Sequence, residues 1–140
     1  ENMLEKDLLN KLTLYFEERS DIAFAFLFGS HANETATNRS DVDIAVYFYP
    51  VIRHPVEFET DGTYEGENII WADIETIVSK DVDMIVLNRV PATVAAAALR
   101  GQPLVIKDSG LYLDFMTAVT DEADSFMDYI ISDYQERYAV

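Results

Sequence analysis

The chain has 140 residues, 49% of them hydrophobic, and we expect one domain over residues 1–140 with one hydrophobic core. It contains no cysteine, which excludes disulfide bridges and thiolate metal sites and agrees with a cytoplasmic location. No apolar run is long enough to cross a bilayer, and the N-terminus lacks a secretory signal pattern, so we expect no membrane contact.

With 26 acidic and 10 basic side chains, the formal net charge is −16 at pH 7. This charge repels the phosphates of a long nucleic acid and argues against such a polymer as a direct partner. The acidity serves either solubility or the attraction of a basic partner protein, and charge by itself does not separate the two.

The first half of the chain predicts one helix and two strands. The run from Ile22 to Phe28 has strand composition and ends at Gly29. A second strand covers 42–48, and Pro50 ends it. Residues 49–68 form a long excursion whose conformation the pattern leaves open. Apolar residues at helical spacing predict a helix over the first twenty residues. These residues are Met3, Leu4, Leu8, Leu12, Tyr15 and Phe16.

The second half alternates helical and strand patterns. Pro91 suits the first turn of a helix, Gly101 its C-terminal cap, and Ser109 the N-cap of the last helix. We therefore predict one α/β (α+β) domain in which helices flank a small mixed sheet and a long helix ends the chain. The expected elements are a helix over 69–78, a strand over 82–87, a helix over 92–99, a strand over 104–106 and a helix from 109 almost to the C-terminus.

The first strand runs directly into Gly29 and Ser30, which precede a polar segment. Free backbone N–H groups at the start of a helix, together with a hydroxyl, can bind an anion such as phosphate. Most Gly-Ser pairs after a strand are ordinary turns, so this pair indicates a phosphate site only in combination with further polar residues nearby in the chain.

Two carboxylates stand at the start of the second strand. Asp41 and Asp43 are two positions apart, and the period of a strand places both on one face. A cation relieves their mutual repulsion, and oxygen ligands of this kind suit Mg²⁺. The alternative is an Asx-type turn at Ser40 and Asp41 in solvent. Because apolar residues continue beyond the pair, we expect at least one carboxylate at the rim of the sheet.

A third acid interrupts the apolar strand over 82–87. Asp is disfavoured inside strands, and if this strand pairs beside the one that carries Asp43, Asp83 completes a cluster of three carboxylates. It would then act as a metal ligand or as a base for an attacking hydroxyl. Asp81 faces the same way, so the register could exchange the two, although we favour Asp83. An ordinary Asp at a strand entrance is the remaining alternative.

The segment FGSHANETATNRSDVDIAVYF resembles the defining motif of the DNA polymerase β-like nucleotidyltransferases, in which Gly-Ser is followed after ten residues by Asp-x-Asp. Here the ten residues are His31–Ser40. The short chain is similar to the MNT-type minimal nucleotidyltransferases over roughly residues 20–107. It departs from their pattern at His31 and at Asn33-Glu34.

The resemblance implies an antitoxin enzyme that is paired with a HEPN-type ribonuclease toxin and transfers AMP from ATP to a tyrosine of that toxin. It implies that Asp41 and Asp43 share two Mg²⁺ ions, with Asp83 as a further ligand or as the proton acceptor. The β- and γ-phosphates would lie against Gly29 and Ser30. Arg39 would neutralise the leaving pyrophosphate, although a solvated loop arginine is the commoner explanation. The candidate nucleotide-binding residues are Gly29, Ser30, Arg39 and Ser40.

Two other functions stay open. One is nucleotide transfer to a small hydroxyl compound such as an aminoglycoside, which the short chain disfavours because such enzymes usually add a substrate domain. The other is an antitoxin that binds its toxin without catalysis. The tyrosines of the last helix have helical spacing and either pack on the domain or dock a partner. These tyrosines are Tyr129, Tyr134 and Tyr138.

Overall fold

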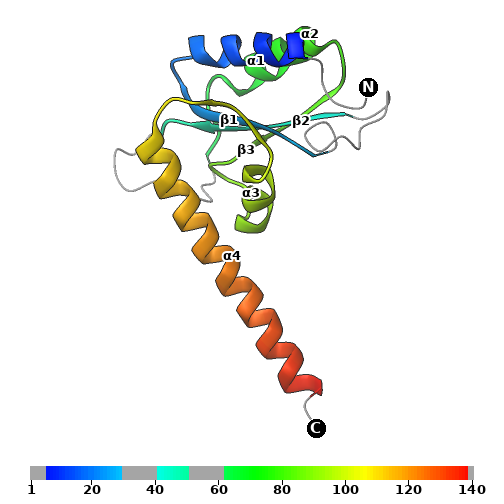
Figure 1. Ribbon diagram of the computed structural model, residues 1–140, viewed down its shortest axis with the longest axis vertical. Coiled ribbons are helices and arrows are strands. Elements are labelled where there is room, and N and C mark those ends of the chain that lie inside the picture. The colour runs from blue at the N-terminus through cyan, green and yellow to red at the C-terminus, as the bar shows by residue number, and fades with distance from the viewer. Residues whose placement is uncertain (1–5, 30–40, 51–61, 139–140) are drawn as a thin grey trace.

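The computed structural model describes residues 6–29, 41–50 and 62–138. A four-stranded mixed sheet forms the centre of this part of the chain, and helices lie against both of its faces (Figure 1). The mixed α/β architecture confirms the fold class that the sequence predicts. The elements in chain order are α1 (Lys6–Glu18), β1 (Ile22–Phe28), β2 (Val42–Phe48), α2 (Glu67–Val78), β3 (Val82–Val86), α3 (Ala92–Leu99), β4 (Gln102–Ile106) and α4 (Ser109–Tyr138).

The strands are ordered β3-β2-β1-β4, so β1 and β2 occupy the middle of the sheet. β1 runs antiparallel to both β2 and β4, whereas β2 and β3 are parallel. Parallel neighbours need a crossover connection, and α2 lies on the connection between these two strands. The sheet is therefore mixed because the crossover through α2 brings β3 parallel to β2.

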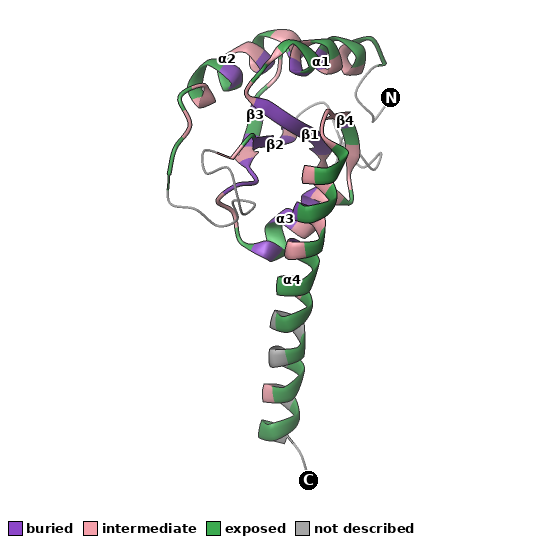
Figure 2. Ribbon diagram, turned by 90° about the vertical axis from the view of Figure 1, so that its left-hand side faces the viewer, coloured by how far each residue is buried: buried purple, intermediate pink, exposed green. Residues whose placement is uncertain are grey.

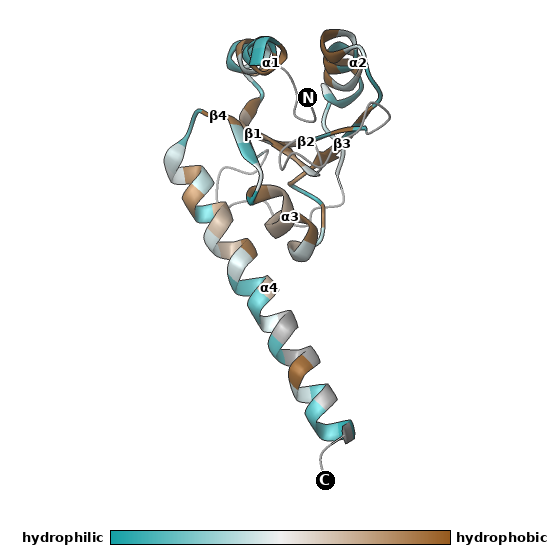
Figure 3. Cartoon of the chain, turned by 45° about the vertical axis from the view of Figure 1, so that its right-hand side comes forward, coloured by the Kyte–Doolittle hydropathy of each residue, from teal (hydrophilic) through white to brown (hydrophobic). Residues whose placement is uncertain are grey.

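Both faces of β1 are covered, which explains its uninterrupted apolar sequence. Ala25 and Leu27 belong to the core under α1 and α2, whereas Phe24 and Phe26 belong to the core under α3 and the start of α4. Figure 2 shows the buried central strands, and Figure 3 shows the two pairs of helices on opposite sides of the sheet. Polar groups of a functional site are thereby restricted to the rim of the sheet.

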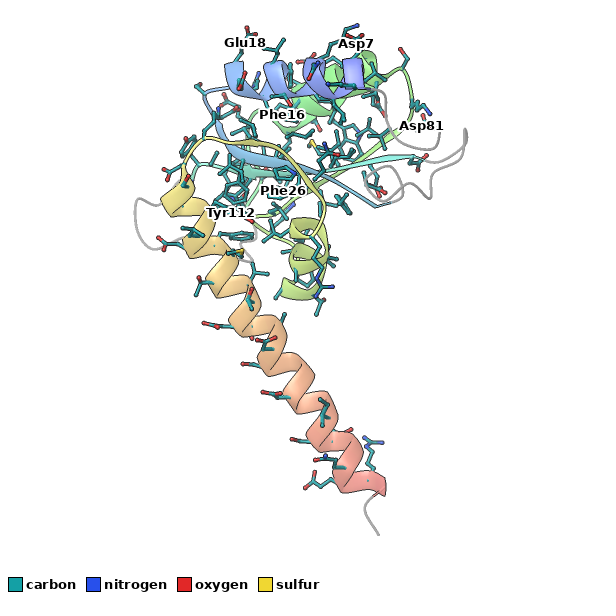
Figure 4. The ribbon with its side chains drawn as sticks, viewed as in Figure 1. Asp7, Phe16, Glu18, Phe26, Asp81 and Tyr112 are labelled. Carbon is teal, nitrogen blue, oxygen red and sulfur yellow. The ribbon has the colours of Figure 1, made fainter. Side chains whose placement is uncertain are left out.

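The first turns of α4 dock on aromatic side chains of the sheet, and the rest of the helix extends away from it (Figure 1). Phe115 packs against Tyr47 with ring centroids 4.5 Å apart, and Tyr112 stacks on Phe26 at 5.7 Å (Figure 4). Beyond Ala123 most of the described side chains are exposed. Although α4 has 30 residues, none of the helices in the described ranges has the apolar length needed to span a bilayer.

The N-terminal ends of the last two helices differ slightly from the prediction. The N-cap of α4 is Asp108, whose Oδ1 accepts a hydrogen bond from the N–H of Leu111 at 2.9 Å. The prediction of Ser109 as N-cap is therefore wrong, because the helix already begins at that residue. Pro91 is the N-cap residue of α3, one position before the first turn.

Gly101 follows the C-cap residue Arg100 of α3, but its main constraint comes from the sheet. A Cβ atom at Gly101 would lie 2.2 Å from the carbonyl oxygen of Leu27 and 2.9 Å from the Cα of Phe28. Glycine is required here because β4 begins against the end of β1, and a helix-end signal alone does not reveal this contact.

Asn88 is fully buried and joins the segment after β3 to the end of β2. Its Oδ1 accepts a hydrogen bond from the N–H of Phe48 at 2.9 Å, and its Nδ2 donates to the carbonyl oxygen of Phe48 at 3.0 Å. One side chain therefore satisfies both backbone groups of a residue that is also buried.

We predict that Asn88→Ala lowers the free energy of unfolding by about 3 kcal/mol, because it leaves both backbone groups of Phe48 buried without these hydrogen bonds. Urea unfolding followed by circular dichroism measures the effect. Asn10→Ala is the matched control, since Asn10 is exposed on α1, and it should change the stability little. Equal effects of the two substitutions would contradict this role of Asn88.

An ion pair ties the start of α2 to the segment after β3. Arg89 donates from Nη1 to Glu67 Oε2 at 2.6 Å and from Nη2 to Oε1 at 2.7 Å, and the N–H of Tyr64 also donates to Oε2. Burial, the largest single effect, raises the pKa of the Glu67 carboxyl, but the hydrogen bonds from Arg89 and Tyr64 together bring it below its usual value.

The lowered pKa of Glu67 predicts an acid-sensitive contribution to stability. A carboxyl whose pKa is lower in the folded state stabilises the fold above its unfolded pKa of about 4.3, and this contribution disappears as the pH falls through the folded pKa. Glu67→Gln should therefore lower the free energy of unfolding by up to about 1 kcal/mol at neutral pH. The gap to the parental protein should close in urea titrations as the pH falls through the folded pKa of Glu67. A constant gap would contradict the ion pair as its source.

Candidate active site

The end of β1 lies directly against the carboxylate of Asp43. Phe28 is the register partner of Asp43 across the antiparallel pair, and Gly29 comes next with a φ of 74°. A Cβ atom at Gly29 would lie 2.2 Å from Oδ2 of Asp43. The backbone at the end of the first strand and the second carboxylate of the motif are thus neighbours in space, as their spacing in the sequence suggests.

The parallel register brings a second carboxylate next to Asp43. Asp43 pairs with Asp83 across β2 and β3, and neighbouring strands are about 4.8 Å apart. The next residues along the two strands, Ile44 and Met84, lie in the core under α1 and α2, so both carboxylates face the opposite side of the sheet. Asp43 is half-buried and Asp83 is exposed. Two negative charges therefore stand side by side at the sheet rim, where their repulsion favours a bound cation.

Asp41 and Asp81 stand just before the two parallel strands, and both are exposed. The carbonyl oxygen of Asp81 accepts the N–H of Val42 at 2.9 Å, which continues the ladder beyond β3. Figure 4 shows Asp81 near the start of β3. The register therefore puts Asp83, and not Asp81, opposite Asp43. This is the arrangement that the sequence favours.

Two side chains of α2 reach the strand that carries Asp83. Trp71 donates from Nε1 to the carbonyl oxygen of Val82 at 2.8 Å, and Oε2 of Glu75 accepts the N–H of the same residue at 3.3 Å. In the sequence alone, Trp71 is a core or rim aromatic and Glu75 carries no signal. Only the position of α2 over β3 reveals their contact with the residue before Asp83.

The donor atoms at this rim suit a hard divalent cation. Asp41, Asp43 and Asp83 offer carboxylate oxygens, and Mg²⁺ usually takes one or two carboxylates together with substrate phosphate oxygens. No three His, Cys, Asp or Glu side chains of the described ranges converge into a complete metal-binding group. Mg²⁺ binding by Asp41, Asp43 and Asp83 therefore stays a prediction.

Several candidate residues lie outside the described part of the chain. They are Ser30, Arg39 and Ser40 of the candidate nucleotide site and the motif departures at His31 and Asn33-Glu34.

Comparison with known proteins identifies the family. Residues 10–110 match the family described as "Polymerase beta, Nucleotidyltransferase". The chain belongs to this family. The matched residues include Gly29 and Ser30, the three aspartates and the four strands of the described sheet. No curated protein matches the chain.

Solved structures share this nucleotidyltransferase fold over nearly the whole chain. A chain of a toxin–antitoxin complex with AMP-PNP has a TM-score of 0.65 at 17% identity, covering 92% of this chain and 98% of its own. A chain of the toxin–antitoxin complex MntA-HepT has a TM-score of 0.61 at 17% identity, covering 94% and 99%. A third, from a complex of a tri-AMPylated Shewanella oneidensis HEPN toxin with an MNT antitoxin, has a TM-score of 0.62 at 14% identity, covering 94% and 99%. The shared fold thus extends beyond the residues over which the motif resemblance was expected.

We predict that Gly29→Ala disturbs the nucleotidyltransferase site. The positive φ disfavours any side chain by about 1–2 kcal/mol, and the added Cβ would force the Asp43 carboxylate to move. Urea unfolding should show a loss of at least about 1 kcal/mol. The control is Gly62→Ala, because a Cβ at Gly62 meets no atom within 4 Å. Equal stability of the two variants would mean that Gly29 is not constrained.

Proposed function

We propose that this protein is a nucleotidyltransferase antitoxin that transfers AMP from ATP to a tyrosine hydroxyl of a HEPN-type toxin. The observation that carries the proposal is the pairing of Asp43 with Asp83, beside the backbone of Gly29, in a chain of the polymerase beta nucleotidyltransferase family. An all-carboxylate site at the end of a glycine turn suits metal-assisted transfer from a nucleoside triphosphate.

Each residue of the site has a role that its place in the fold suggests. Asp41 and Asp43 would hold two Mg²⁺ ions, and Asp83, the register partner of Asp43, would be either a further ligand or the proton acceptor. When bound, these ions would neutralise the triphosphate and activate the acceptor hydroxyl. Gly29 leaves room for the Asp43 carboxylate against the backbone that would approach the phosphates. Asp83 is the more exposed carboxylate of the pair and can accept the proton of the attacking hydroxyl.

The proposed partner is supported by two observations. The similar structures are toxin–antitoxin complexes, one of which contains AMP-PNP and another a tri-AMPylated HEPN toxin. In this chain, α4 extends away from the sheet and exposes acidic side chains that suit a basic protein surface (Figure 2). The exposed acidic residues of α4 are Asp114, Asp121, Glu122, Asp124, Asp128 and Glu136.

We predict that Asp41→Asn, Asp43→Asn and Asp83→Asn each lower AMP transfer by at least about 100-fold, because loss of a direct ligand should exceed the effect of losing its supporting partners. Transfer is measured with α-labelled ATP and from the intact mass of the co-expressed toxin. Asp81→Asn is the matched control, since it makes the same change at the entrance of β3 outside the register pair, and it should keep the parental rate.

The same experiment separates the alternatives. Parental transfer rates in the Asp43→Asn and Asp83→Asn variants would overturn the site assignment. A toxin that is neutralised but carries no AMP would indicate an antitoxin that acts by binding alone. Labelling of small hydroxyl compounds in the absence of the toxin would indicate a small-molecule nucleotidyltransferase.

A further inference from the structure

The outer edge of β3 is held at one residue, Val82, which precedes Asp83. In the parallel ladder the N–H of Val42 bonds the carbonyl oxygen of Asp81, and the N–H of Leu87 bonds that of Val46. Backbone groups alternate in direction along a strand, so the odd-numbered residues of β3 face β2. The N–H and carbonyl of Val82 therefore face the open edge, where Glu75 and Trp71 bind them.

Val82, at which this edge is held, is the middle residue of Asp81-Val82-Asp83, a tripeptide with the same sequence as Asp41-Val42-Asp43. Val42 begins β2 and Val82 begins β3, each stands between two aspartates, and the two valines pair with each other. A slip of β3 by one residue would turn Asp83 toward the apolar core, and a slip by two would set Asp81 beside Asp43. Because side chains alternate with a period of two, a two-residue slip keeps every side chain of β3 on its own face, and alternation alone does not distinguish it from the observed register.

We propose that Trp71 and Glu75 are positioning residues that fix the backbone of β3 at Val82 and so keep the neighbouring Asp83 carboxylate beside Asp43. Both hydrogen bonds act on the backbone of Val82, whose side chain is also buried in the core under α2. α2 therefore constrains Val82 in three ways, through two hydrogen bonds and through the packing of its side chain. The Asp83 carboxylate stays exposed on the other face of the sheet. This inference rests on the proposed function, in which Asp83 acts beside Asp43.

Covering the edge would by itself also protect β3 against pairing with another chain. That purely structural role affects stability or aggregation, whereas a positioning role also changes the affinity of the carboxylates for a metal ion. Metal affinity in the presence of a nucleotide therefore distinguishes the two, and it is measured without any turnover.

The test uses the full chain with Mn²⁺ as a paramagnetic substitute and a non-hydrolysable ATP analogue, and free Mn²⁺ is followed by electron paramagnetic resonance. The double variant Trp71→Phe/Glu75→Ala removes the indole donor and the carboxylate acceptor. We expect it to raise the Kd for Mn²⁺ about tenfold, the range found when partners that orient metal ligands are lost. Glu75→Gln, which keeps an acceptor oxygen, should stay close to the parental value.

The matched control is Tyr15→Phe. It removes the hydrogen bond from Tyr15 Oη to Asp73 Oδ2, 2.6 Å long, and so weakens the packing of α1 on α2 without touching β3. We expect it to lower the melting temperature while leaving Mn²⁺ affinity unchanged. If Tyr15→Phe weakened Mn²⁺ binding as much as the double variant does, the loss of Mn²⁺ affinity would reflect general destabilisation. The positioning role would then be wrong.

Asp83→Asn is measured in parallel to separate the two proposals. If Asp83→Asn weakens Mn²⁺ binding and the double variant does not, the positioning role of Trp71 and Glu75 is wrong while the proposed function stands. If Asp83→Asn leaves Mn²⁺ binding unchanged, the role of Asp83 in the proposed function is wrong, and the positioning role falls with it.

Discussion

The parallel pairing of β2 with β3 is the constraint on which the site depends. Val42 and Val82 align the two strands, and the alignment places Asp43 and Asp83 side by side on one face of the sheet. Parallel strands cannot be joined by a tight turn, so the pairing requires the crossover that contains α2. The same helix then packs on one face and contacts the edge of β3. The position of the carboxylates therefore depends on the same helix that packs against the core.

The candidate site lies at the rim of the sheet, because the central strands are buried. β1 and most of β2 are buried on both sides by two pairs of helices, and an uncompensated carboxylate there would be strongly unfavourable. At the end of β1, Gly29 lets the chain pass within contact distance of the Asp43 carboxylate. The paired acids and the glycine thus lie at the rim of the sheet, outside its apolar core.

Family membership and function rest on different observations. The family match and the solved structures establish the nucleotidyltransferase fold, yet a fold hosts many functions and the identities are 14–17% for the structures compared. The proposed function is supported by the site, where hard oxygen donors meet a glycine turn, and by the exposed acidic length of α4. The charge of −16 that disfavours a nucleic acid partner is consistent with a basic protein partner.

The sequence by itself determined the local features. Apolar runs and breakers located β1 and β2 over the ranges that the structure shows, and the period of a strand placed Asp41 and Asp43 on one face. Only the tertiary structure shows that Asp83, and not Asp81, lies opposite Asp43, because the register is a contact between segments about forty positions apart. The tertiary structure likewise revealed why Gly101 must be glycine and that Trp71 and Glu75 bind the backbone of Val82. These contacts join elements that are far apart in the sequence, and no local pattern predicts them.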